Sequence, residues 1–307
     1  MIGELRGCFR AGWALVALVI VAARLGAEEF PRELVNFHAA ERNPVFTATG
    51  AGGWDVKIRE RGWILREPQG WRMWYTGYDG TSNGTRRLGH ATSPDGLVWT
   101  RSPGNPLDGK NWIEDMQVVQ QGETYLMFAE GEKDQAQWLS SRDGLHWKQE
   151  GTLDVRTTAG KPIEAGPYGT PTVWHEDGVW HLFYERRDAG VWLARSRDLK
   201  IWTNVQNEPV LKPGPAAHDR QMIAMNQIIR HEGRYYGYYH GSGVVDKPRL
   251  WTTNVAVSTD LVHWKKYPGN PLLPERENKS SGMLVHDGKQ YRLYTMHDQV
   301  NVHFASP

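Results

Sequence analysis

Short aromatic and apolar runs recur along the chain and alternate with tight turns. The most aromatic of these runs lie at residues 71–80, 124–134, 179–188, 234–243 and 290–298. Each follows another apolar run and a turn that contains glycine, as at Gly122, Gly178 and Gly233, a spacing typical of an antiparallel hairpin. No segment shows a sustained helical period. The pattern predicts an all-β chain that repeats a unit of three or four short strands five times.

A second repeat follows the hairpins. The pattern Ser-x-Asp-x-x-x-Trp occurs at residues 93–99, 141–147, 196–202 and 258–264. Its interval of roughly 50 to 60 residues indicates a propeller or a solenoid. An aspartate in a turn accepts bonds from backbone N–H groups, so we interpret the repeat as scaffold, with its tryptophan packed between units.

Five antiparallel sheets arranged radially form a five-bladed β-propeller, which leaves few exposed strand edges. The fifth unit is followed by few residues before residue 307 and lacks an outer strand. Residues 41–50 resemble the segments that follow other repeats, at 102–107 and 267–273. We therefore expect residues 41–50 to supply the missing strand and close the ring.

Composition narrows the class of protein. The 36 basic and 35 acidic residues give a net charge of +1, which does not suggest a nucleic acid or an anionic membrane as the partner. The chain has 15 Trp and 12 Tyr, and in a secreted protein some such rings stack on carbohydrate while most pack in the core.

The first 27 residues have the features of a secretory signal. Arg6 and Arg10 precede an apolar stretch, and small residues precede Glu28. The single cysteine, Cys8, lies in this segment, so disulfides and cysteine metal sites are not expected in the rest of the chain. We predict a signal peptide at 1–27, one catalytic propeller domain at 28–307, a secreted or periplasmic location and a monomer.

Function is expected where the blades differ. In a propeller the start of each inner strand and the end of the second strand meet on one face of the channel. Four inner strands are preceded or opened by an acidic residue, namely Asp55, Asp115, Glu164 and Asp219. Carboxylates grouped around one pocket shift one another's pKa values, which suits acid and base catalysis.

Five blades, with Asp55 opening the first, Asp115 the second and Glu164 in the Glu-Ala-Gly-Pro segment of the third, resemble the five-bladed glycoside hydrolases. The resemblance is to glycoside hydrolase family 43 and, more distantly, to families 32, 117 and 130. It implies that Asp55 is the general base, that Asp115 positions the acid and tunes its pKa, and that Glu164 is the general acid. A difference from family 43 is that Val56, and not proline, follows Asp55.

Strand spacing leaves alternatives open. Asp55 and Glu164 lie about twice as far from their hairpin glycines as Asp115 does, so other groups are also candidates. The end of the second strand brings Glu185 to the same face, and His218 with Asp219 form a candidate acid pair.

Aromatic, cationic and amide side chains near the expected channel mouth are candidates for substrate binding. They are Trp54, Trp112, Tyr168, Arg186, Asn226, His240, Lys279 and His297. No cofactor is expected to be required. The resemblance implies that a structural calcium ion can occupy the central channel, although no metal-ligand spacing supports one independently.

These observations predict a secreted glycoside hydrolase that degrades an oligo- or polysaccharide, with inversion and through two carboxyl groups. Three alternatives remain. They are a retaining fructosidase-like hydrolase with Asp55 as nucleophile, a glycoside phosphorylase, and a propeller that binds glycans without cleaving them.

Overall fold

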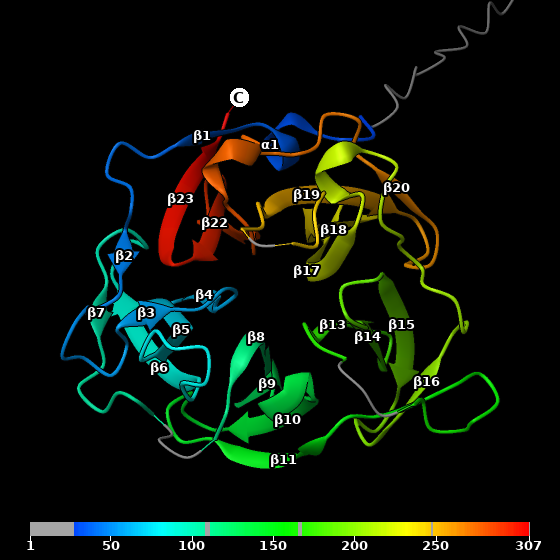
Figure 1. The fold of residues 1–307 in the computed structure, drawn as a ribbon, viewed down its shortest axis with the longest axis horizontal. Coiled ribbons are helices and arrows are strands. Elements are labelled where there is room, and N and C mark those ends of the chain that lie inside the picture. Colours follow the sequence, from blue (N-terminus) through cyan, green and yellow to red (C-terminus); the bar gives the residue numbers. More distant parts are fainter. Residues whose placement is uncertain (1–27, 108–110, 165–167, 247, 307) are drawn as a thin grey trace, which may run out of the picture.

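The computed structural model describes residues 28–107, 111–164, 168–246 and 248–306. The expected signal peptide and Cys8 lie outside the described residues. Five mainly antiparallel sheets surround a central axis, and the innermost strand of each lies nearest to it (Figure 1). The prediction of an all-β, five-bladed propeller is confirmed.

The blades follow one another along the chain. Blade 1 contains β3 (Lys57–Ile58), β4 (Trp63–Glu67), β5 (Gly70–Tyr78), β6 (Arg87–Ser93) and β7 (Thr100–Arg101). Blade 2 contains β8 (Glu114–Gln121), β9 (Thr124–Glu130), β10 (Ala136–Ser141) and β11 (Lys148–Thr152). Blade 3 contains β13 (Thr172–Glu176), β14 (Val179–Glu185), β15 (Val191–Ser196), β16 (Ile201–Asn204) and, parallel to β16, β12 (Asp154–Arg156). Blade 4 contains β17 (Met222–His231), β18 (Arg234–Ser242), β19 (Thr252–Ser258) and β20 (Trp264–Lys266).

Blade 5 closes the ring with strands from both ends of the chain. It contains β21 (Met283–His286), β22 (Tyr291–His297), β23 (Gln299–Ala305), β1 (Phe37–Ala39) and β2 (Phe46–Thr47). Strand β2 falls within residues 41–50, as predicted, and pairs with β23. Strand β1 pairs with the other half of β23 and was not anticipated. The short helices are α1 (Arg32–Val35), η1 (Glu132–Asp134), η2 (Ala217–Asp219) and η3 (Glu275–Glu277).

The Ser/Asp/Trp repeats form structural turns, as predicted. In blade 2, Asp143 Oδ1 accepts the N–H groups of Leu145 and His146, each at 2.8 Å. The tryptophan of the same repeat packs on an aromatic ring of the preceding blade, as Trp147 does on Trp74 with ring centroids 6.2 Å apart. The tryptophans of the repeats in blades 3 and 4 make the same kind of contact, Trp202 with Phe128 and Trp264 with Phe183, and these contacts join neighbouring sheets. Within the described part of the chain, no helix is long and apolar enough to cross a membrane.

Candidate active site

A cavity of about 400 Å³ lies at one end of the central channel and takes residues from all five blades. It is strongly charged. Its carboxylates are Glu60, Asp115, Glu130, Asp134, Glu185 and Asp188. Its arginines are Arg59, Arg187 and Arg249. The cavity lies on the face that the strand directions predict, where inner strands begin and second strands end.

A left-handed residue at the start of the inner strand brings side chains to the axis in four blades. These residues are Arg61, Asp115, Thr170 and Ser281, with φ of 41°, 48°, 46° and 56°. A positive φ is uncommon outside glycine and is strained for a β-branched residue such as Thr170. In each of these blades, the residue two positions later lies on the inner strand and pairs with an aromatic residue of the second strand. These aromatic residues are Trp74, Phe128, Phe183 and Tyr294. The strain is therefore repeated at one structural position, next to the cavity.

The Arg61 side chain fills the channel beneath the cavity. Its side chain is fully buried, and its guanidinium donates to the carbonyls of Met116, Pro171 and Met225, at 3.2, 2.6 and 3.4 Å. These carbonyls belong to blades 2, 3 and 4, while the Arg61 N–H donates to Met296 O of blade 5. Burial lowers the pKa of Arg61 to about 10, so it remains a cation at neutral pH. One side chain thus joins the inner strands and places a positive charge below the carboxylates.

Asp115 is the carboxyl group best placed to donate a proton. It is 7% exposed, it lines the cavity, and its Oδ1 has no hydrogen-bond partner among the described residues. Burial, followed by the charges of Glu60 and Glu114, raises its pKa well above the ordinary value, whereas Arg59 and Arg61 oppose the rise. The shift favours the protonated form of Asp115, whose side chain lines the cavity.

Glu130 and Glu185 end the second strands of neighbouring blades and meet at Gly169. Glu130 Oε1 accepts the N–H of Thr170, and Glu185 Oε1 accepts the N–H of Gly169 at 2.9 Å. A Cβ added to Gly169 would collide with both Oε1 atoms, so the two carboxyl groups need glycine between them. Burial raises the pKa of Glu130 well above its ordinary value and that of Glu185 to about 8. The two groups share a site that disfavours two negative charges.

Asp188 completes the acidic wall. Its N–H donates to Glu185 Oε2, and burial raises its pKa to about 6, with Arg249 opposing the rise. Asp188 is therefore mostly ionised at neutral pH, whereas the shift at Asp115 favours the protonated form. The cavity thus contains both a proton donor and a proton acceptor, which is the requirement for acid and base catalysis.

The structure places Asp55 outside this cavity. Its side chain is fully buried and accepts bonds from Thr49, from Tyr75 at 3.1 Å and from Arg101 Nε at 3.1 Å. Asp219 of blade 4 is also fully buried and has the same surroundings, with Tyr239 at 2.9 Å and Lys266 at 2.6 Å. This duplication in two blades is explained by a structural role.

Two further candidates also lie outside this cavity. Glu164 is exposed, follows the bridge between Arg156 and Pro162, and does not line the cavity. The adjoining residues 165–167 lie outside the described part of the chain. His218 is buried in η2 beside Asp219, and it also does not line the cavity.

Of the predicted substrate contacts whose side chains the structure describes, His240 alone lines the cavity. Its Nδ1 lies 2.8 Å from Asn226 Oδ1, so Asn226 orients the imidazole from behind. The other described candidates make structural contacts: Trp54 with Tyr75, Trp112 with Glu114, Tyr168 with Leu153, Arg186 with Trp192 and Lys279 with Glu277. His297 ends β22, and its side chain lies outside the description.

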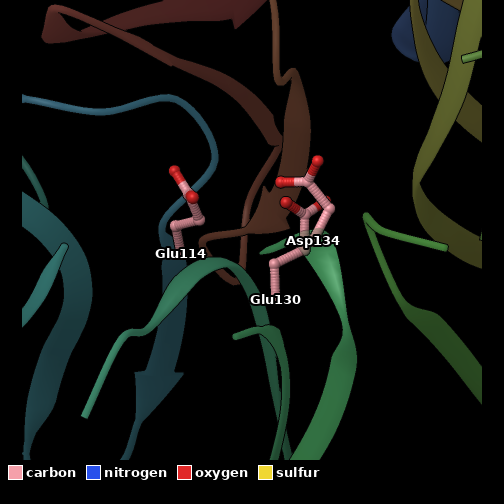
Figure 2. Close-up of side chains that lie close together, drawn as sticks. All are labelled: Glu114, Glu130 and Asp134. Carbon is pink, nitrogen blue, oxygen red and sulfur yellow. The ribbon is translucent and has the colours of Figure 1, made fainter. Parts of the chain in front are cut away.

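Three carboxylates beside the cavity form a candidate cation site. One oxygen each of Glu114, Glu130 and Asp134 lies within 4.8 Å of the others (Figure 2). Oxygen ligands suit calcium, but Glu114 already binds Arg59 at 3.1 Å and lies 3.6 Å from Arg86. Since two guanidinium groups neutralise Glu114, the cluster fits a divalent cation poorly. A calcium ion in the channel stays a prediction.

Several cavity residues have no obvious sequence signal, namely Glu60, Asp188, Arg59, Arg187 and Arg249. The sequence does contain a signal that Glu130 and Glu185 are equivalent. Each ends an aromatic strand at the same distance from its Ser/Asp/Trp turn. Short motifs favour Asp55 and Glu164 as site residues. Positions that are equivalent in several blades, such as those of Glu130 and Glu185, indicate the cavity instead.

Comparisons with known proteins place the fold among carbohydrate-active propellers. A candidate glycoside hydrolase of Parabacteroides distasonis superposes with a TM-score of 0.74 at 15% identity, over 91% of this chain and 98% of that one. A structure from family 130, described as mannoside phosphorylases that include hydrolases of β-1,2 mannosidic linkages in Candida mannan, gives 0.71 at 16% identity, over 89% and 94%. The β-1,2-mannobiose phosphorylase of Listeria innocua gives 0.65 at 14% identity, over 88% and 96%.

Sequence comparison adds less. No family model matches the chain. Two uncharacterized proteins of Mycobacterium tuberculosis, from strains CDC 1551 / Oshkosh and ATCC 25618 / H37Rv, are 25% identical over 201 residues. The match covers 59% of this chain and 66% of each relative, so it spans just under two thirds of their length. The chain therefore has the fold of glycoside hydrolase and phosphorylase propellers, and a specific resemblance to family 43 is not confirmed.

Proposed function

We propose that this protein is an enzyme that cleaves a glycosidic bond in an oligo- or polysaccharide. Asp115 is the general acid that protonates the leaving oxygen. Glu130, Glu185 and Asp188 lie together in the cavity. Whichever of these three carboxyl groups is ionised is the base that activates water. The observation that carries this proposal is the buried carboxyl group of Asp115, whose Oδ1 has no partner among the described residues and whose pKa is raised.

The charge distribution supports the assignment. General acid catalysis needs one carboxyl group that stays protonated near neutral pH, and base catalysis needs another that does not. Burial raises the pKa of Asp115 strongly, and that of Asp188 only to about 6. The resemblance implied Asp55 as the base and Glu164 as the acid. In this proposal, carboxyl groups that line the cavity have these two roles instead.

A second reaction is favoured by two cavity arginines. Arg187 and Arg249 form no ion pair with a carboxylate within 4.0 Å among the described residues, so their charges are available to an anion. Inorganic phosphate in place of water would make the enzyme a glycoside phosphorylase, with the same acid. The arginines would then orient phosphate for attack on the anomeric carbon.

We also propose that residues 1–27 are removed on export and that the enzyme acts outside the cytoplasm on a carbohydrate. Inversion at the anomeric carbon belongs to the proposal and follows from attack by water or phosphate on the face opposite the leaving oxygen.

The test is product analysis on a panel of aryl glycosides and β-linked and α-linked oligosaccharides, with and without phosphate, followed by NMR of the product anomer. A free sugar of inverted configuration supports hydrolysis, and a sugar 1-phosphate that forms only with phosphate supports phosphorolysis. Glycan binding with no turnover of any substrate would overturn the enzyme proposal in favour of a glycan-binding propeller.

A further inference from the structure

A groove between blades 1 and 2 lies beside the catalytic cavity. Its volume is about 490 Å³, within the range of small-molecule sites. Blade 1 contributes Asn83 and Thr85, from the turn between β5 and β6. Blade 2 contributes Trp112, just before β8, and Gly131, just after β9. Since β5 and β9 end and β8 begins on the face that holds the cavity, the groove lies on that face too.

The groove and the cavity share a boundary in blade 2. Glu130 lines the cavity, and the next residue, Gly131, lines the groove. The Trp112 indole, which lines the groove, donates to Glu114 Oε1 at 2.7 Å, and Glu114 belongs to the three-carboxylate cluster beside the cavity. The two sites are therefore neighbours, close enough for one carbohydrate chain to occupy both.

The lining of the groove is polar but almost uncharged. Glu132 is the one charged residue among those that line it, whereas the cavity is lined by six carboxylates and three arginines. Amide and hydroxyl groups donate and accept hydrogen bonds, as sugar hydroxyls do, and the lining has no cation that would pair with an acidic sugar. The groove therefore suits a neutral, hydroxyl-rich ligand. Its amide and hydroxyl side chains are Asn83, Thr85, Asn111, Gln137 and Gln149.

Trp112 provides a fixed aromatic surface in this groove. Its ring is partly exposed, and the guanidinium carbon of Arg86 lies over one face, 5.0 Å from the ring centroid. The indole N–H is held by Glu114, and the Trp112 carbonyl accepts from Gln137 Nε2 at 2.7 Å. A ring held in this way loses little freedom on binding, and an aromatic face suits the apolar face of a sugar ring.

Polar groups without partners lie beside this ring. Gln137 is 4% exposed, and its Oε1 accepts from Gln149 Nε2 at 2.6 Å, which orients the exposed Gln149 amide. The Gln149 Oε1 has no hydrogen-bond partner among the described residues, and the same is true of the exposed side chains of Asn83 and Thr85. A few polar groups beside an aromatic ring are the usual composition of a ligand pocket.

The scaffold of the propeller does not explain Trp112. This residue lies three positions before Asp115, the left-handed residue of blade 2, and the corresponding residues of blades 1 and 5 are Ile58 and Asn278. Trp112 also lies outside the apolar cores of the blades. An indole that neither repeats between blades nor packs in a core is better explained by ligand binding.

We propose that this groove is a subsite for a neutral sugar unit of the chain that is cleaved in the cavity. Trp112 stacks on the sugar ring, and Asn83, Thr85 and Gln149 bond its hydroxyl groups. The neutral character of the unit follows from the lining, while the saccharide itself rests on the proposed function. The substrate is then an oligo- or polysaccharide with a neutral unit close to the cleaved bond.

Isothermal titration tests the subsite without turnover. Asp115→Asn serves as the parent protein, so that no probe is consumed. The probes are three neutral tetrasaccharides, cellotetraose, mannotetraose and xylotetraose, and the acidic tetragalacturonate. We expect at least one neutral probe to bind at least tenfold more tightly than tetragalacturonate, with an affinity that changes little with salt concentration.

Variants in this parent locate the binding. Trp112→Ala removes the ring and should weaken binding of the preferred probe at least tenfold. Trp112→Phe keeps a ring but not the N–H that Glu114 accepts, so it should retain most of the affinity if stacking is the role of Trp112. Asn83→Ala/Gln149→Ala changes only exposed side chains and should weaken binding at least threefold, which tests the groove even if Trp112→Ala does not fold.

Trp192→Ala is the matched control. Trp192 of blade 3 is also partly exposed and also lies near a guanidinium, that of Arg186 at 5.9 Å, but it lines neither the groove nor the cavity. We expect this variant to bind the preferred probe as the parent does.

The proposal is overturned if no neutral probe binds, or if tetragalacturonate binds as tightly as the best neutral probe. It is also overturned if Trp112→Phe or Trp192→Ala weakens binding as much as Trp112→Ala, or if Asn83→Ala/Gln149→Ala binds as the parent does. Failure of the enzyme proposal is separate, because the titration measures no turnover. Binding in the groove by a wild-type protein that cleaves nothing would support the sugar site and contradict only the proposed reaction.

Discussion

Glu130 and Glu185 hold the same position in neighbouring blades, and their Oε1 atoms both lie within 3 Å of the place that a Cβ at Gly169 would occupy. Two carboxyl groups this close in a buried site do not readily ionise together, so the pair retains a proton at pH values where an exposed glutamate has lost it. The arrangement links the repeat of the fold to the chemistry of the cavity.

The first prediction concerns stability and pH. The pKa of Glu185 is about 8 in the folded protein and near the ordinary value of 4.5 in the unfolded chain. Between these values the folded state binds more protons, so the free energy of unfolding falls as pH rises from about 4.5 to about 8, by at most about 1.4 kcal/mol per pH unit for one carboxyl group.

Urea unfolding of the wild type and Glu185→Gln at pH 5, 6, 7 and 8 measures this dependence. Glutamine cannot ionise, so the variant is expected to show a smaller slope. Glu164→Gln is the control, because Glu164 is exposed and its substitution should leave the slope unchanged. Equal slopes for Glu185→Gln and the wild type would disprove the retained proton.

A methyl group at Gly169 should disturb the site. Its Cβ would meet both carboxyl groups, and overpacking of this kind costs about 1–3 kcal/mol. We expect Gly169→Ala to lower the free energy of unfolding by that amount and to reduce kcat/KM at least tenfold. Gly104→Ala, whose Cβ would meet nothing within 4 Å, should change neither. Wild-type kinetics in Gly169→Ala would argue against a role for the pair.

The third prediction separates the charge of Arg61 from its packing. Both Arg61→Met and Arg61→Lys leave carbonyls of the inner strands unpaired, so each should lose several kcal/mol of stability, on the order of 1–3 kcal/mol per unpaired group. Arg61 lowers the pKa of Asp115, so removing the charge raises that pKa. The general acid then stays protonated to higher pH.

As pH rises, kcat/KM should therefore begin to fall at a higher pH in Arg61→Met than in the wild type. In Arg61→Lys it should fall at the same pH as in the wild type. If kcat/KM falls at the wild-type pH in both variants, Arg61 acts only as a structural link between blades.

Asp55 and Asp219 provide a matched pair. Because both accept bonds from a tyrosine and a cation in the same arrangement, Asp55→Asn and Asp219→Asn should each cost about 1–3 kcal/mol of stability. We expect the folded variants to keep kcat within tenfold of the wild type. A folded Asp55→Asn protein without activity, beside an active Asp219→Asn protein, would return Asp55 to the role of general base.

Much of the fold could be predicted from the sequence because strands and turns leave local signals. The aromatic run at 124–134 contains β9 (Thr124–Glu130), and the Ser/Asp/Trp repeats mark the outer turns. Residues 41–50 repeat a segment found in other blades, and this repetition predicts the closing strand. The extra strand β1 has no counterpart in the repeat and so gave no signal.

The site was harder to predict because it depends on the backbone. The left-handed conformation at Arg61 and Thr170 turns these residues toward the axis, and neither residue type signals it. Asp115 adjoins a strand start in the sequence, and in the structure it lines the cavity. Asp55 has the same kind of position in the sequence, but Arg101 and Tyr75 lie against it and bury it.

The central claim is that Asp115 donates the proton to the leaving oxygen. Asparagine tolerates a left-handed backbone, so Asp115→Asn changes the proton donor with little change in conformation. The decisive measurement is kcat/KM of the wild type and Asp115→Asn on aryl glycosides whose leaving groups differ in pKa. We expect a loss of about 10²–10⁴-fold on poor leaving groups and a far smaller loss on activated ones. An equal loss on every leaving group, or no loss on any, would contradict the assignment of Asp115 as the general acid.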